Sequence, residues 1–194
     1  MGFSQRSKRL NDGQELAVEG AEAHDDSETI GGAKALDNAE GANIKTEFNR
    51  LFAKGVYLLG MREHSIQEMT DKLNARSELV DIVLAVVDEL VENNFLSDER
   101  FAESYVRSRQ NKGFGPVKIR SEFHAKGITS RLAEEHINAN SPEWINVARE
   151  QYEKKYGVKP LDSYKEWTKR ARFMQGRGFT MEHIQAVMPS ADFY

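Results

Sequence analysis

The sequence contains no cysteine among its 194 residues, which excludes disulfides, thiolate catalysis and cysteine-ligated metal sites. No apolar run approaches the roughly 18 residues that a membrane-spanning helix needs. The first residues also lack the apolar segment of a secretory signal peptide. We therefore expect a cytoplasmic protein that does not contact a membrane.

Catalytic and metal-binding patterns are missing as well. The five histidines show no HExxH motif and no metal-like i, i+4 pair, and the sequence has no GxSxG or EF-hand spacing. The glycine-rich stretch GFGPVKIRS, residues 113–121, lacks the Gly-Lys-Ser/Thr ending of a P-loop, and no strand pattern precedes it. We expect a protein that is not an enzyme and that uses no cofactor and no metal.

The N-terminal residues 1–46 differ in composition from the rest of the chain. They contain nine acids, five bases and a single aromatic residue, Phe3, without a sustained apolar period. Such a segment buries too little apolar surface to offset its ordering entropy. We predict a disordered acidic tail. Because the remaining 22 acids and 22 bases cancel, the tail carries the whole net charge of −4.

From residue 47 onward the apolar residues recur with helical spacing, and no alternation typical of β-strands is present. The first predicted helix has its apolar face over residues 48–59, and the clearest amphipathic run covers residues 79–91. Two Ser-x-x-Glu patterns, at residues 65–68 and 163–166, predict capping boxes in which the Glu side chain reaches back to the Ser amide. Further helices are predicted over residues 98–111, 116–127, 130–139, 142–156, 164–175 and 181–188.

These helices fall into three groups of three, and the groups resemble one another. The segment AKGIT at 125–129 matches GRGFT at 176–180 with a spacing of 51 residues. A repeat of this length indicates an array of helical units. We predict an all-α fold, an elongated and curved array of three tandem three-helix repeats over residues 47–96, 97–140 and 141–194.

The charges are segregated along the repeats. Residues 78–99 contain seven acids and no base, whereas residues 105–126 contain six bases and one acid, and residues 154–178 contain eight bases and two acids. This pattern predicts an acidic first repeat and a basic surface on the second and third. The helix that starts at Pro116 has its first amides beside Lys112 and Lys118, an arrangement that suits a phosphate or a carboxylate. A plain turn between two helices is the alternative interpretation.

Aromatic residues lie among these bases, as they would if bases of a single strand stacked on them. Most have the spacing of core residues, however. We expect Phe114, in the glycine loop, to be exposed. The residues that we assign to the core are Phe101, Tyr105, Phe123, Trp144 and Trp167.

An ordered set of short motifs resembles the RecX regulatory proteins of bacteria. The motifs are MREHS at 61–65, FLSDERFA at 95–102, KGFGP at 112–116, KGI at 126–128, KYG at 155–157 and RGF at 177–179. The resemblance covers roughly residues 47–188. The N-terminal tail is longer than the family pattern, and Phe123 stands where a leucine is common.

This resemblance implies a function that composition does not reveal. Proteins of the family bind the RecA recombinase filament on single-stranded DNA, lodge in its helical groove and suppress its ATPase, strand-exchange and coprotease activities. They thereby restrain recombination and the SOS response. We accordingly expect a monomer whose partners are the RecA filament and, weakly or indirectly, single-stranded DNA. The candidate contact residues are Arg107, Arg109, Lys112, Phe114, Lys118, Arg120, Lys126, Lys155, Lys169, Arg170, Arg172 and Arg177.

Two other functions fit parts of the sequence. A three-helix unit with a basic helix after a glycine turn also suits a general, helix-turn-helix-like DNA-binding module that acts without RecA. A helical scaffold whose charge blocks pair with an unrelated protein is the third possibility. Sequence-selective duplex binding without RecA would indicate the former, and a stoichiometric partner that survives nuclease treatment would indicate the latter.

Overall fold

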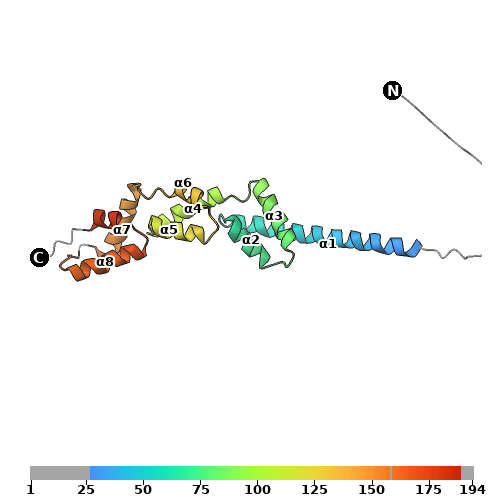
Figure 1. Ribbon diagram of the computed structural model, residues 1–194, viewed down its shortest axis with the longest axis horizontal. Helices are drawn as coiled ribbons and strands as arrows, with labels where there is room; N and C mark the ends of the chain where they lie inside the picture. Colours follow the sequence, from blue (N-terminus) through green and yellow to red (C-terminus); the bar gives the residue numbers. More distant parts are fainter. Residues whose placement is uncertain (1–26, 158, 189–194) are drawn as a thin grey trace, which may run out of the picture. The chain divides into compact units, whose positions relative to one another are not determined.

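The computed structural model describes residues 27–157 and 159–188, and everything regular within them is helical. Figure 1 shows these helices coloured along the chain. This confirms the predicted all-α class. The helices are α1 (Ser27–Leu59), α2 (Ile66–Asn74), α3 (Val80–Glu92), α4 (Asp98–Asn111), α5 (Pro116–His124), α6 (Ser130–His136), α7 (Glu143–Tyr156), α8 (Tyr164–Gly176) and α9 (Met181–Val187). None of them combines the length and the apolar character needed to span a membrane.

Helix starts agree closely with the sequence because they are set by local capping. A Ser or Thr hydroxyl accepts a hydrogen bond from the amide three residues further on at the starts of α2, α4, α6, α8 and α9. The two predicted capping boxes form only in part. The Glu68 carboxylate pairs with Arg62 and Lys126, and the Glu166 carboxylate pairs with Arg170, rather than with the Ser amides.

The first helix begins earlier than the sequence suggested. Residues 27–46, which we assigned to a disordered tail, are helical in α1, and residues 1–26 of that tail lie outside the described residues. Stretches such as KALDNAE at 34–40 contain good helix formers, and extending an existing helix is far easier than nucleating one. The expected lack of an apolar face holds where side chains are described, since residues 40–46 are all exposed.

Three separate clusters of buried side chains form the core, one for each group of helices. In the second group, α4, α5 and α6 pack against one another (Figure 1). The predicted core residues Phe101, Phe123 and Trp144 are buried in this cluster, with Tyr105 half-buried beside them. The first cluster consists of Leu51, Met69, Leu73, Val83, Val86, Val87, Leu90 and Leu96. The third consists of Ala148, Tyr152, Tyr156, Ala171, Met174, Phe179, Ile184 and Met188, with Trp167 half-buried against it.

Polar contacts join the first group of helices to the second. The Ile66 amide donates to the Asp98 carboxylate at 2.8 Å, and the Arg100 guanidinium pairs with the Glu63 carboxylate at 3.0 Å. Lys126, at the end of α5, pairs with Glu68 of α2. The motifs MREHS and FLSDERFA therefore lie at one interface, where their polar residues bind each other.

Buried His64 gives the first group a dependence on pH. Its Nδ1 lies 3.0 Å from the Arg62 carbonyl oxygen, to which it donates. Burial lowers the pKa of this imidazole below its ordinary 6.5, although the bond to Arg62 opposes the shift. The unfolded chain consequently takes up a proton at higher pH than the folded chain. The free energy of unfolding is expected to fall as the pH drops below about 6.5.

Urea titrations above and below pH 6.5 test this expectation. The His64→Asn variant, which keeps a donor but cannot become an imidazolium, is expected to lose this pH dependence. The His124→Asn variant, changed at an exposed position, is expected to retain it. Identical pH profiles for His64→Asn and the unmodified chain would contradict the assignment.

Candidate functional site

The glycine loop between α4 and α5 is closed by the third group of helices. The Gly115 amide donates to the Arg177 carbonyl oxygen at 2.8 Å, and the Val117 amide donates to the Gly178 carbonyl oxygen at 3.0 Å. Two of the amides that we expected to receive a phosphate or a carboxylate are thus already paired. The predicted anion site at the start of α5 is therefore wrong.

Close backbone approach explains the glycines at this contact. A Cβ on Gly115 would lie 2.4 Å from the Gly178 carbonyl oxygen, and a Cβ on Gly178 would lie 2.5 Å from the Lys118 amide nitrogen. The sequence correctly indicated that the backbone is approached closely here. The approaching group, however, is the matching RGF turn of the next repeat rather than a ligand.

Phe114 is half-buried, contrary to our expectation that it would be exposed. It packs against the second core cluster. Three cations surround its ring: Lys118 and Arg177 each lie 5.0 Å from the ring centroid, and Arg109 lies 5.4 Å from it. Such distances are typical of cation–π interactions. Phe114 therefore gathers positive charge from α4, α5 and the end of α8 at one place.

A second aromatic ring extends this cluster. Arg177 also lies 5.4 Å from the Phe173 ring centroid, and the Lys155 ammonium lies 3.5 Å from the same centroid. The Arg177 guanidinium donates to the Lys112 carbonyl oxygen at 3.0 Å. Phe173 was not among our contact candidates, although its position among the bases of residues 154–178 was an available signal. The junction surface is defined here as Arg109, Lys112, Phe114, Lys118, Lys155, Phe173 and Arg177.

Most of the positive charge on the junction surface has no acidic partner. Arg109 pairs with Glu122 at 2.9 Å and donates to the Tyr105 hydroxyl at 2.6 Å. Burial raises the pKa of that Tyr105 hydroxyl, so it stays a neutral donor and acceptor. Among the described residues, no acid pairs with the other four cations of this surface, which are Lys112, Lys118, Lys155 and Arg177. This surface can attract phosphates or carboxylates.

Several predicted contact residues instead bind acids of the same chain. Arg107 pairs with Glu103 at 2.7 Å on the exposed side of α4. Lys126 pairs with Glu68, as described above, and lies 5.4 Å from the Tyr105 ring centroid. These two cations are partly neutralised. Lys126 nevertheless shares the Tyr105 ring with Arg109 and lines a hollow together with Arg109 and Lys112.

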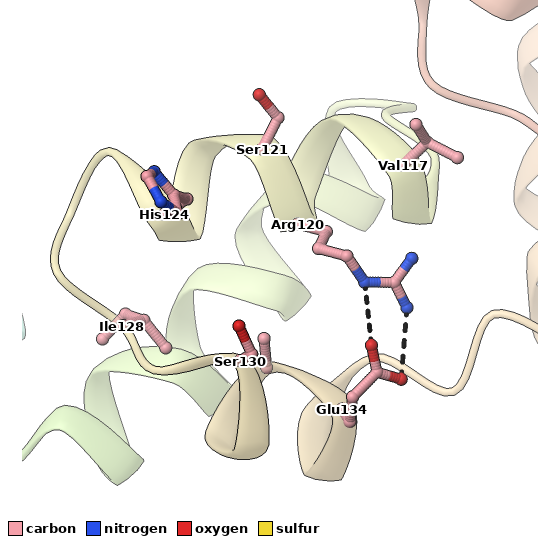
Figure 2. A pocket seen from close by; sticks show the side chains of 8 residues that line it. Val117, Arg120, Ser121, His124, Ile128, Ser130 and Glu134 are labelled. Atoms are coloured by element: carbon pink, nitrogen blue, oxygen red, sulfur yellow. Dashed lines mark hydrogen bonds and ion pairs between the residues drawn. The ribbon is translucent and has the colours of Figure 1, made fainter.

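Arg120 faces a cleft between α5 and α6. Figure 2 shows its guanidinium directed at the Glu134 carboxylate. Arg120 Nε lies 3.1 Å from Glu134 Oε1, and Arg120 Nη2 lies 3.4 Å from Glu134 Oε2. The cleft has a volume of about 450 Å³, and Val117, Ser121 and His124 line it from the α5 side. Because its charge is paired within the chain, Arg120 is a weaker candidate for an external anion than Lys112, Lys118, Lys155 and Arg177.

Arg170 was predicted to contact a partner, but its exposed fraction is 2%. Its guanidinium donates to the Tyr152 hydroxyl at 2.8 Å and to the Pro160 and Lys159 carbonyl oxygens at 2.8 and 3.1 Å. It also pairs with Glu166 at 3.1 Å. Arg170 is therefore a structural residue that ties the segment before α8 to α7, and the contact prediction is wrong for it.

Lys169 and Arg172 occupy the outward side of α8. Lys169 lies 3.4 Å from Glu166 and its side chain is exposed. Both cations line an open hollow together with exposed Tyr164. They are accessible, but no contact joins them to the junction surface.

The family models, the related sequences and the solved structures that match this chain are all RecX proteins. Models of the second and third three-helix domains of RecX match residues 97–137 and 143–188. The regulatory protein RecX of Chromohalobacter salexigens is 36% identical over 136 residues, which cover 70% of this chain and 89% of that protein. The regulatory protein RecX of Salmonella typhimurium is 32% identical over 159 residues, covering 77% of this chain and 96% of the relative.

Solved structures share the fold. A crystal structure of RecX from Lactobacillus salivarius covers 74% of this chain, with 95% of its own length matched, at a TM-score of 0.64 and 22% identity. A second crystal structure, of a regulatory protein RecX, covers 78% of this chain and 76% of its own length at a TM-score of 0.66 and 17% identity. These likenesses support the arrangement of three-helix units.

Proposed function

This chain belongs to the RecX family of regulatory proteins, and we propose that it binds the RecA filament on single-stranded DNA and inhibits its ATPase, strand-exchange and coprotease activities. Inhibition of this kind restrains recombination and the SOS response. We further propose that it acts as a cytoplasmic monomer built of repeats 47–96, 97–140 and 141–194. Regulation through binding, rather than a catalysed reaction, is the activity that the family name describes.

The junction surface carries this proposal. A RecA filament on DNA offers protein carboxylates and nucleic-acid phosphates, and cations without acidic partners attract both. Cations that lie beside aromatic rings are also common where single strands bind. Phe114 and Phe173 hold Lys118, Lys155 and Arg177 in place, so little side-chain entropy is lost when a partner is bound.

The first repeat has the opposite character. Within this repeat, residues 78–92 contain five acids and no base, and all five acids lie on exposed positions of α3 or just before it. We propose that this repeat contacts a basic protein surface of RecA, while the junction surface contacts acidic groups or DNA. The first repeat and the junction surface would then contact groups of opposite charge on the same RecA filament.

The single-strand-dependent ATPase rate of RecA from the same organism tests the function. Added full-length protein is expected to lower the rate, and inhibition well below one molecule per RecA would indicate action at filament ends. An unchanged rate with a folded protein would remove the recombinase function and favour the DNA-binding module that acts without RecA.

Three exposed or half-exposed lysines test the junction surface. The triple change Lys112→Gln, Lys118→Gln and Lys155→Gln is expected to raise the concentration for half-inhibition of RecA roughly tenfold, since about 0.5 kcal/mol for each lost contact sums to about 1.5 kcal/mol. If the lysines contact phosphates, the log–log salt slope of DNA binding also becomes shallower by about 2.

The matched control for this triple variant removes three positive charges from positions outside the junction surface. Lys45→Gln, Lys72→Gln and Arg149→Gln change the net charge equally but leave the junction surface intact. We expect this control to inhibit RecA like the unmodified chain. Equal loss of inhibition in both triple variants would mean that only net charge matters, and it would contradict a localised site.

A further inference from the structure

The outward side of α8 presents an exposed aromatic ring on a basic helix face. Tyr164, the first residue of α8, is 65% exposed. Its ring is nearly parallel to that of Trp167, with an angle of 7° between the planes and 6.4 Å between the centroids. An open hollow of about 680 Å³ lies against this part of the helix. This hollow is lined by Ser163, Tyr164, Lys165, Glu166, Thr168, Lys169 and Arg172.

Helical spacing aligns the charges with the ring. Tyr164, Thr168 and Arg172 follow one another at intervals of four residues and so form one row, and Lys165 and Lys169 form the adjacent row. The opposite face of α8 is buried through Arg170 and Met174. The ring and the three cations are therefore presented on the same side of a helix that is fixed by its core contacts.

The cations of this face are available to an external anion. Within the described residues, Lys165 and Arg172 form no ion pair. Lys169 makes only a 3.4 Å contact with Glu166, and the charge of that acid is already balanced by buried Arg170 at 3.1 Å. The face consequently carries a local excess of positive charge beside an exposed ring.

We propose that this face of α8 is a binding site for single-stranded nucleic acid. A base stacks on Tyr164, and phosphates of the adjoining nucleotides bind Lys165, Lys169 and Arg172. The inference rests on the proposed function in that the strand inside a RecA filament is the expected ligand. It adds a site that shares no residue with the junction surface.

A nucleic acid fits these features better than a protein partner does. A single flat ring with a parallel neighbour offers a stacking platform to any base. Tyr164 is the one strongly exposed, large apolar side chain among the residues that line the hollow. A stable protein interface would need a broader apolar centre. Phe114, which we first expected to be exposed, is half-buried with three cations of its own chain around its ring.

Fluorescence anisotropy with a labelled oligo(dT), in the absence of RecA, tests the site. The Tyr164→Ala variant of the full-length protein is expected to bind roughly 5- to 150-fold more weakly, the range for loss of a stacked base. Tyr164→Phe, which keeps the ring, is expected to bind like the unmodified protein. The matched control is Tyr57→Ala, because Tyr57 is 61% exposed and lies near the Lys54 ammonium on another helix.

An abasic oligomer of the same length separates stacking from charge. Tyr164→Ala is expected to bind it as well as the unmodified protein does, whereas Lys165→Gln with Arg172→Gln weakens binding to both oligomers. Unchanged oligo(dT) affinity in Tyr164→Ala would overturn the proposal. So would equal weakening by Tyr57→Ala, or equal losses on both oligomers for Tyr164→Ala.

The RecA ATPase assay distinguishes this inference from the proposed function. If the unmodified protein inhibits RecA but Tyr164→Ala binds oligo(dT) normally, the inference fails and the proposed function stands. If oligo(dT) binding depends on Tyr164 but RecA is not inhibited, the inference stands and the proposed function fails. Normal DNA binding with lost inhibition in Tyr164→Ala would reassign this face to a protein contact and overturn the nucleic-acid site.

Discussion

Replacing Arg170 with alanine is expected to lower the free energy of unfolding by roughly 3–5 kcal/mol, the range for removing one partner of a buried charged network. The guanidinium is almost fully buried and satisfies the Tyr152 hydroxyl and two backbone carbonyl oxygens of the segment before α8. Without it, the buried Tyr152 hydroxyl and the two part-buried carbonyl oxygens lose this donor. The third repeat should therefore unfold at much lower urea concentration.

Two further variants test whether the loss of stability is specific to the Arg170 guanidinium. Arg170→Lys is expected to recover only part of the lost stability, because an ammonium cannot reach four acceptors with the planar geometry of a guanidinium. Arg172→Ala, two residues away and exposed, is expected to change the free energy of unfolding by less than about 0.5 kcal/mol. Similar urea midpoints for Arg170→Ala and Arg172→Ala would contradict the structural role of Arg170.

Replacing Gly178 with alanine is expected to break the contact between the second and third repeats. Gly178 has a φ of +92°, and an added Cβ would lie 2.4 Å from the Lys118 Cβ and 2.5 Å from its amide nitrogen. Backbone strain and this clash together should cost about 3 kcal/mol. Because Arg177 and Phe173 belong to the junction surface, inhibition of RecA should weaken as well.

Gly176 provides a matched control two residues earlier. It is the last residue of α8, and a Cβ there would have no neighbouring atom within 4 Å. Gly176→Ala is therefore expected to leave stability unchanged or to raise it by about 0.5–1 kcal/mol, and RecA inhibition should persist. If Gly178→Ala unfolds and inhibits RecA like Gly176→Ala, the two repeats do not depend on this glycine contact.

The helices were predictable because their signals are local. Ser and Thr caps, Pro116 at the first turn of α5, and the apolar period of α3 act within a few residues, and they set helix starts without reference to the rest of the chain. Residues 27–46 were less predictable. They lack an apolar face, yet their helix continues from one that the core already stabilises.

The candidate site was only partly predictable because it depends on contacts between side chains, some within one repeat and some between repeats. The basic character of residues 105–126 and 154–178 is evident from the sequence. Which of these cations keeps its charge available is not, since Arg107, Arg120 and Lys126 look like Lys112 and Lys118 until their acidic partners are known. Phe114, which we expected to be exposed, is half-buried, whereas Tyr164, for which the sequence predicted no role, is exposed.

By itself, the sequence determined the all-helical class, the repeat, the segregation of charge and the family. Each of these follows from the order of the residues alone and does not depend on which side chains meet in the folded chain. Only the tertiary structure decided that Arg170 is buried, that the amides of Gly115 and Val117 are used by the next repeat, and that Tyr164 is the exposed ring. The first and third of these outcomes depend on packing within the third repeat, and the second depends on the contact between the second and third repeats. Burial and pairing of a side chain follow from such packing, since an arginine can bind a ligand when it is exposed to water but is structural when it is packed against carbonyl oxygens.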